Sequence, residues 1–139
     1  MYGILFREVV AYQNKADRLA AESKPSDFVR NYHASKLQLG AAESARLIEV
    51  SRLCVQQIQV IDQKAAAIIQ EVKSQYRLSP GVPVPPPPAD LAELQSQRTA
   101  VLLAAADSLA AAFGPDRFAS FEGLVRQHVG SGLRAQWAH

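Results

Sequence analysis

The chain has few of the residues on which catalytic and covalent sites usually depend. It contains a single cysteine, Cys54, so it can form no intramolecular disulfide. None of the HExxH, CxxC, GxGxxG, GxSxG or phosphate-loop patterns occurs in its 139 residues. We therefore assign no catalytic residue, no cofactor-binding residue and no metal ligand from the sequence. We expect a protein that is not an enzyme and has no cofactor.

Long apolar runs and clusters of one charge are also missing. No apolar run reaches the roughly 18 residues that a membrane span needs. The 15 Lys and Arg are interspersed with 13 Asp and Glu, whereas a nucleic-acid footprint needs clustered basic residues. We expect no membrane span and no nucleic-acid partner. Residues 1–6 are too short for a signal segment, so the chain is either cytoplasmic or a mature exported protein whose leader was replaced by Met1.

What the sequence does contain is helical periodicity. We expect a single all-α domain over residues 1–139, built as an elongated helical hairpin or bundle of four to five helices. The predicted helices cover about 3–22, 26–37, 41–76, 90–113 and 115–129, with a proline-rich interhelical linker over 78–89. The composition, 48% apolar and 20% charged, suits a folded protein.

The central helix, roughly Ala41 to Tyr76, is the strongest pattern. Gly40 is placed to cap it, and the Glu43 carboxylate can reach back to the amide of Gly40. Inward positions then recur about every 3.6 residues, the period of a straight α-helix: Leu47, Val50, Cys54, Ile58, Ile61, Ala65, Ile68, Val72 and Tyr76. Cys54 lies on this stripe, which favours a small buried hydrophobe over a nucleophile.

Similar stripes mark the other predicted helices. The expected inward residues are Leu5, Val9, Tyr12, Ala16 and Leu19 in the first helix, Phe28, Tyr32 and Leu37 in the second, Leu91, Leu94, Val101, Leu102, Ala105, Leu109 and Phe113 in the fourth, and Phe118, Phe121, Val125 and Val129 in the fifth. We expect Asp90 to cap the fourth helix. Gly114, Pro115 and Asp116 mark the boundary before the fifth, and we expect the tail after Val129 to be frayed.

Six of the eight prolines lie between Pro80 and Pro88. Proline cannot donate to a helix ladder, so this stretch should be extended. One interpretation is a ligand for an SH3-like or WW-like groove. The interpretation we favour is a stiff spacer that returns the chain antiparallel to the central helix.

The three histidines, His33, His128 and His139, fall on different predicted elements. A di-iron bundle would need Glu-x-x-His pairs, and the sequence has none. A metal site that uses His33 or His128 stays open as an alternative. Polar residues near the stripes, such as Gln13 and Gln57, are expected to make interhelical hydrogen bonds.

Two stretches have a similar design: Leu37-x-Leu39-Gly40-Ala41-Ala42-Glu43-x-x-x-Leu47 and Phe113-Gly114-Pro115-Asp116-Arg117-x-x-x-Phe121. Together they resemble the paired Leu-Thr-x-x-Gln signatures of the Spy/CpxP-type (LTxxQ-motif) periplasmic helical proteins and their metal-sensing relatives. The chain departs from both signatures, because Gly40 and Gly114 replace Thr while Glu43 and Arg117 replace Gln. The resemblance implies an exported helical hairpin that acts as a chaperone-like or stress-response binder, and it carries over no ligand residue.

The expected function is therefore that of a non-enzymatic helical binding protein, periplasmic or exported, that holds a protein client or a second copy of itself. Exposed apolar helical surface of this kind usually marks protein–protein contact. Two alternatives stay open. One is a helical bundle with a metal or small-molecule pocket, as in a sensor or an enzyme, and the other is a structural subunit of a larger assembly.

Overall fold

The computed structural model describes the backbone of residues 1–78 and 88–137, and the side chains of 1–75 and 88–130. Within these residues it is all helical. The helices are α1 (Tyr2–Ala21), α2 (Asp27–Arg30), α3 (Tyr32–Lys36), α4 (Ala41–Leu78), α5 (Ala89–Phe113) and α6 (Pro115–Trp137). The predicted all-α bundle with one long helix is confirmed. No helix in the described part of the chain is long and apolar enough to cross a membrane.

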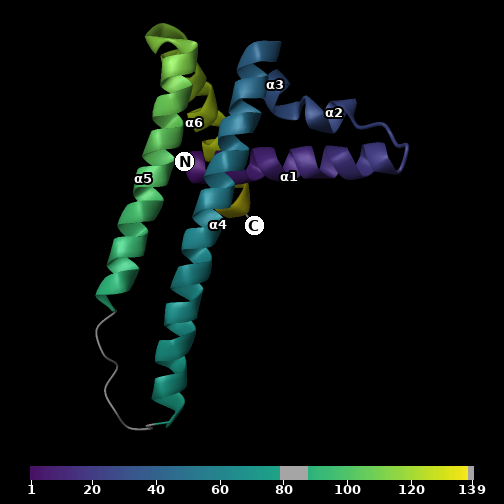
Figure 1. The fold of residues 1–139 in the computed structure, drawn as a ribbon. Coiled ribbons are helices and arrows are strands. Elements are labelled where there is room, and N and C mark those ends of the chain that lie inside the picture. The colour runs from purple at the N-terminus through teal and green to yellow at the C-terminus, as the bar shows by residue number, and fades with distance from the viewer. Residues whose placement is uncertain (79–87, 138–139) are drawn as a thin grey trace.

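Helices α4 and α5 form an antiparallel hairpin, and the other helices gather around one end of it (Figure 1). Helix α1 crosses α4, the short α2 and α3 lie above α1, and α6 turns back from the end of α5. The opposite end of the hairpin extends alone. We call its residues 64–78 and 89–97 the distal hairpin, and the rest of the described chain the head.

One hydrophobic core joins four of the long helices and the residue after α3. Its buried members are Leu5, Phe6 and Val9 of α1, Leu37 after α3, Leu47, Val50, Cys54 and Ile58 of α4, Ala105 and Leu109 of α5, and Phe121, Val125 and Val129 of α6. Most of these are the inward residues that the periodicity predicts. Burial raises the pKa of the Cys54 thiol, which keeps it protonated and unreactive.

The start of α4 is built as the sequence predicts. The Gly40 amide donates to Glu43 Oε1 at 3.1 Å, which satisfies one of the amides that a helix start leaves free. The same carboxylate accepts two bonds from Arg117 at the start of α6, from Nε at 2.8 Å and from Nη2 at 3.0 Å. Arg117 Nη2 also donates to the carbonyl of Gln38. The two stretches that resemble each other in sequence are thus joined through a bidentate ion pair.

Four local expectations need correction. The predicted helix over 26–37 is two short helices separated at Asn31, and Phe28 is 85% exposed because α2 buries none of its four residues. Asp90 lies inside the first turn of α5 after Pro88, and it makes no capping bond. Helix α6 continues past Val129 to Trp137, through two glycines that each cost only about 1 kcal/mol in a helix.

Other boundaries agree closely. Helix α5 ends at Phe113. The next residue, Gly114, has a φ of 83°, which glycine adopts readily, and α6 then begins with Pro115 in its first turn. Residues 79–87 of the proline-rich linker lie outside the described residues, as do the side chains of Tyr76, Trp137 and His139. The antiparallel course of α4 and α5 is the arrangement that the spacer interpretation predicts.

Candidate metal centre

Three side chains from three helices meet in the head: Glu8 of α1, His33 of α3 and His128 of α6. Glu8 Oε1 lies 2.8 Å from His33 Nε2 and 2.7 Å from His128 Nε2. The three potential ligand atoms all lie within 4.8 Å of one another. Within the described residues no other group of three or more His, Cys, Asp or Glu side chains is found this close together.

Core packing places each member of this Glu–His–His cluster. Glu8 lies three residues after the buried Leu5, and His33 lies one turn before the buried Leu37. His128 lies three residues after the buried Val125. Residues three or four apart share a helix face, so burying the apolar neighbours carries the polar groups to the edge of the core. His33 itself is only 4% exposed.

Two tyrosines enclose the cluster. The Tyr12 and Tyr32 rings are 4.7 Å apart, and each lies 5.0 Å from the His33 ring. Tyr32 also lies 5.9 Å from the His128 ring, and the two histidine rings are 5.8 Å apart. These aromatic contacts hold both imidazoles against rotation and limit the access of water.

The electrostatics of the cluster favour an ionised Glu8 carboxylate beside a neutral His33 ring. Burial acts to raise the pKa of Glu8, but hydrogen bonds from His128 and His33 outweigh it, and the pKa is lowered. Burial lowers the pKa of His33 despite the opposing effect of Glu8. Burial, followed by the Tyr32 and Glu8 charges, raises the pKa of Tyr12. Near neutral pH, Glu8 is therefore an anion and His33 is uncharged.

The hydrogen bonds also define the tautomer. Because a carboxylate only accepts, each Nε2 must carry the proton that it shares with Glu8. In neutral His33 the other ring nitrogen, Nδ1, is then a lone-pair acceptor. It is buried and finds no partner among the described residues. A bound ion at Nε2 would move the proton to Nδ1, where it lacks an acceptor.

The donor set fits a borderline divalent metal ion. Imidazole nitrogen and carboxylate oxygen bind Zn²⁺ at about 2.0–2.2 Å, so ligand atoms of a tetrahedral site lie about 3.4 Å apart. Glu8 and the two imidazoles would have to separate by roughly 0.6 Å to admit the ion, a shift within ordinary side-chain adjustment. Three protein ligands leave a fourth position for water or another ligand.

The sequence did not identify this cluster. Its patterns leave His33 and His128 as open alternatives for a metal site and give no sign of a role for Glu8. Glu8 and His128 are 120 residues apart, and Glu8 and His33 are 25 apart, so no short motif joins them. The one local signal is that both histidines lie three or four residues from predicted core positions. Cys54, in contrast, lies in the core as predicted.

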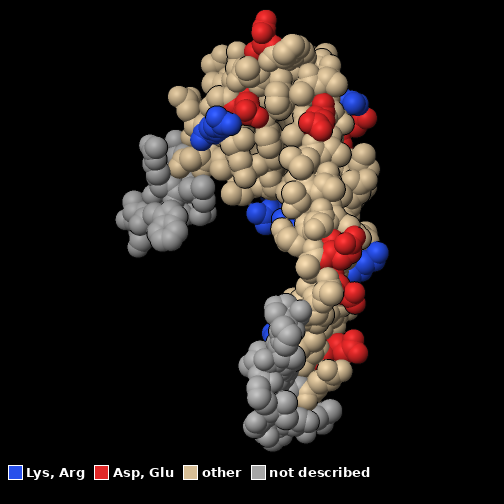
Figure 2. Space-filling view, turned by 90° about the vertical axis from the view of Figure 1, so that its left-hand side faces the viewer, with Lys and Arg blue, Asp and Glu red and all other residues tan. Residues whose placement is uncertain are grey.

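The surface of the hairpin carries no comparable chemistry on the face that Figure 2 shows. Acidic and basic side chains there lie singly or in pairs, and no patch of one charge forms. In the comparisons, no family model, curated protein or solved structure matches this chain. The class that the fold defines is therefore an all-α helical bundle.

Proposed function

We propose that this chain is a non-enzymatic helical protein that binds a divalent transition-metal ion through Glu8, His33 and His128. The observation that carries the proposal is the convergence of one carboxylate oxygen and two imidazole nitrogens, within 4.8 Å, from three helices. Buried polar groups are costly unless they are satisfied. A cluster that leaves His33 Nδ1 without a partner among the described residues gives up stability. A metal ion between the three ligand atoms would add the favourable energy of three ligand bonds to this cluster.

The ligand types select the ion. Imidazole favours Zn²⁺, Cu²⁺, Ni²⁺, Co²⁺ and Fe²⁺, while Mg²⁺ and Ca²⁺ prefer oxygen ligands throughout. Affinity is limited by the missing acceptor at His33 Nδ1, since loss of such outer hydrogen bonds weakens metal sites about 10- to 100-fold. We expect Zn²⁺, Cu²⁺, Ni²⁺ and Co²⁺ to bind, and Mg²⁺ and Ca²⁺ to leave the protein unchanged.

The test uses the full chain stripped with chelator. Each ion is titrated by calorimetry, and Co²⁺ binding is also followed through its visible absorption. At an ion concentration of 100 times Kd, ligand linkage stabilises the fold by about 2.7 kcal/mol, which a melting curve detects as a higher Tm. His128→Asn and Glu8→Gln should abolish the titration heat and the Tm shift. Glu49→Gln removes a carboxylate that is exposed on α4 and serves as the matched control.

Circular dichroism of each variant separates loss of a ligand from loss of the fold. A folded His128→Asn protein that binds Zn²⁺ as tightly as the unchanged chain would contradict the proposal. Equal Tm shifts with Zn²⁺ and Mg²⁺ would contradict it as well. His33→Asn is a less clean variant, because His33 is buried.

A second candidate function rests on the outer surface of the hairpin. Leu53, Val60 and Ile69 of α4 and Leu103 of α5 are large apolar side chains with 42–60% of their surface exposed. Such exposure supports a chaperone-like binder of protein clients or of a second copy, in the periplasm or elsewhere outside the cytoplasm, as the Spy/CpxP-type resemblance implies. A cytoplasmic location is the alternative.

This candidate is tested by suppression of the aggregation of a chemically unfolded client. Leu53→Ser combined with Leu103→Ser should reduce the suppression, while the same measurement on Glu49→Gln should match the unchanged chain. Absence of any suppression by the unchanged chain would eliminate the candidate. Cell fractionation of the native host decides between the two locations.

A further inference from the structure

A second region of the head has the chemistry of a ligand site and shares no residue with the Glu–His–His cluster. It is a hollow of about 600 Å³ between the middle of α1 at Gln13, the α2–α3 segment and the first three turns of α4. Its polar and charged lining residues are Gln13, Arg30, Asn31, Ser44 and Arg52. Its apolar lining residues include Leu39 and Ile48. We call it the α1–α4 hollow.

The hollow exists because the facing side chains are small. Ala41, Ser44 and Ala45 of α4 line it, together with Ala34 of α3 and Gly40 just before α4. None of these has a side chain long enough to reach across to α1 or α2. The larger residues beside them, Leu39 and Ile48, are half-buried and supply an apolar wall.

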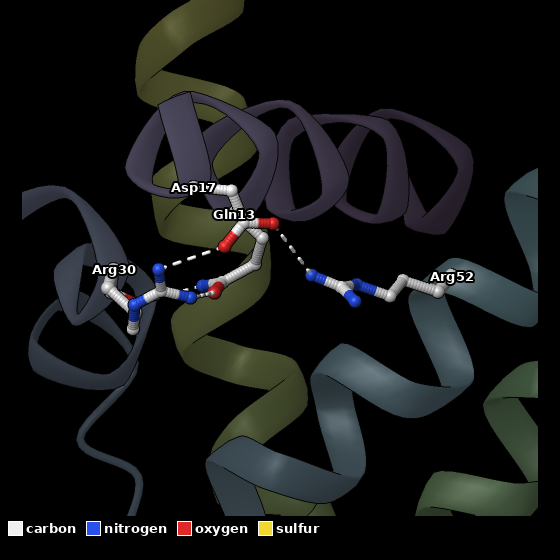
Figure 3. A network of polar contacts seen from close by, with 4 residues as sticks. All are labelled: Gln13, Asp17, Arg30 and Arg52. Carbon is white, nitrogen blue, oxygen red and sulfur yellow. Dashed lines mark hydrogen bonds and ion pairs between the residues drawn. The ribbon is translucent and has the colours of Figure 1, made fainter. Parts of the chain in front are cut away.

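Arg30 is held rigidly at one side of this hollow (Figure 3). Its Nη1 donates to Gln13 Oε1 at 3.2 Å and its Nη2 donates to Asp17 Oδ1 at 2.9 Å. The buried Gln13 side chain donates in turn to the Arg30 carbonyl at 2.8 Å. This interhelical bond is of the kind that the sequence predicts for Gln13. A guanidinium fixed in this way loses little conformational entropy when it binds an anion.

Arg52 on α4 faces Arg30 from the other side, with Asp17 between them (Figure 3). Its Nη2 lies 3.7 Å from Asp17 Oδ2, beyond hydrogen-bond distance, and it makes no other hydrogen bond or ion pair within the described residues. The two guanidinium groups and the single carboxylate leave a surplus of one positive charge. Arg52 is therefore available to a second anionic group.

We propose that the α1–α4 hollow binds a small organic anion, with its carboxylate or phosphate group between Arg52 and Arg30 and its carbon skeleton against Leu39 and Ile48. Guanidinium groups bind both kinds of oxyanion through paired N–H donors. Asp17 already demonstrates the geometry, because its two oxygens face the two arginines. It is also the internal competitor of the ligand, since an entering anion must draw Arg52 away from it.

The experiment is a calorimetric titration of the full chain at constant ionic strength with three probes: inorganic phosphate, succinate and benzoate. Binding of phosphate alone assigns a phosphate ligand, and binding of succinate or benzoate assigns a carboxylate. Arg52→Gln should lower the affinity for the probe that binds at least tenfold. Asp17→Asn should raise that affinity, because it removes the competing carboxylate. Arg46→Gln, which removes an arginine from the same helix outside the hollow, should leave the affinity unchanged.

Two results would overturn the proposal. One is the absence of heat and of a Tm shift with all three probes at millimolar concentration. The other is an equal loss of affinity in Arg52→Gln and Arg46→Gln, which would mean that anion binding depends only on the overall charge of the protein. Because Arg52 is about half exposed and loosely held, its variant should fold normally, and circular dichroism verifies this.

Discussion

The head and the distal hairpin are built from the same two long helices with the same periodicity, yet they differ in what they bury. In the head, α4 places Leu47, Val50, Cys54 and Ile58 in a core shared with α1, α5 and α6. In the distal hairpin, only Leu94 among the described side chains is buried, and the stripe residues Ala65, Ile68 and Val72 are half-exposed. One pair of helices cannot enclose its own apolar stripe.

The same difference explains why the clusters of polar side chains lie in the head. The head contains the polar contacts that join three or more elements, namely the Glu–His–His cluster and the Gln13–Asp17–Arg30–Arg52 network (Figure 3). At the edge of the distal hairpin, the Arg98–Asp62 pair joins only α4 and α5, at 3.3 Å. Convergence of several polar groups requires several helix ends or faces at one place, and only the head provides them.

Among the tests of this comparison, we expect the largest effect when a buried side chain is truncated. Phe121 is fully buried in the head, so Phe121→Ala should cost about 3–5 kcal/mol of unfolding free energy. Ile68→Ala in the distal hairpin should cost about 1 kcal/mol, because much of the side chain is already hydrated. Urea unfolding followed by circular dichroism measures both. Similar costs for the two variants would show that the distal hairpin is as well packed as the head.

The next test is pH, which should act through the head. The pKa of His33 is lowered on folding, so the unfolded chain binds the proton more readily and stability falls as pH drops below the ordinary value of 6.5. The pKa of Glu8 is also lowered on folding. Its contribution to the stability of the fold is therefore present above pH 4.5, the ordinary pKa of a glutamate, and is lost as the pH falls through the lower pKa of the folded state. We expect Tm to decrease from pH 7.5 to 4.

His33→Asn identifies the source of this effect. Between pH 7 and 5.5 its Tm should vary less than that of the unchanged chain, because the titrating ring is gone. His128, Tyr12 and Tyr32 pack against the same carboxylate and ring, and they remain in this variant. An unchanged slope over this range would exclude His33 as the group responsible.

A smaller effect should separate the two ion pairs that join distant helices. Arg117 binds Glu43 through two hydrogen bonds and also reaches the Gln38 carbonyl, whereas Arg98 makes one contact with Asp62 at 3.3 Å. We expect Arg117→Gln to lower Tm more than Arg98→Gln, since bidentate pairs in partly buried surroundings are worth more than single exposed ones. Raising the salt concentration should reduce the difference. A larger loss of Tm for Arg98→Gln would contradict this prediction and show that the Arg98–Asp62 pair stabilises the fold more.

The smallest effect is expected on the outer face of the distal hairpin. Ile69 is 42% exposed there, so Ile69→Ser should change the unfolding free energy by no more than about 0.5 kcal/mol. Thermal melting of the pair Ile69→Ser and Ile68→Ala measures the contrast between neighbouring outward and inward positions. A loss above 1 kcal/mol for Ile69→Ser would place this face in a contact that α4 and α5 do not supply.

Much of the fold could be predicted from the sequence because its signals are local. The 3.6-residue stripe of α4, the bond from the Gly40 amide to Glu43, and the break at Gly114 and Pro115 all depend on residues within about one turn of each other. The errors occurred where local signals compete. The segment 26–37 is too short for its periodicity to decide how it folds, and the outward direction of Phe28 depends on where α1 lies.

The sequence by itself therefore determined the helical class, the long α4, the buried residues of α4 from Leu47 to Ile61 and the buried state of Cys54. The tertiary structure alone decided that Glu8 meets His33 and His128, and that Arg30 and Arg52 face each other across Asp17. The physical reason is the range of the interactions. Helix periodicity and capping act between residues a few positions apart, whereas the meeting of side chains 25 to 120 residues apart depends on the angles at which helices cross. Those angles are set by the packing of the whole core.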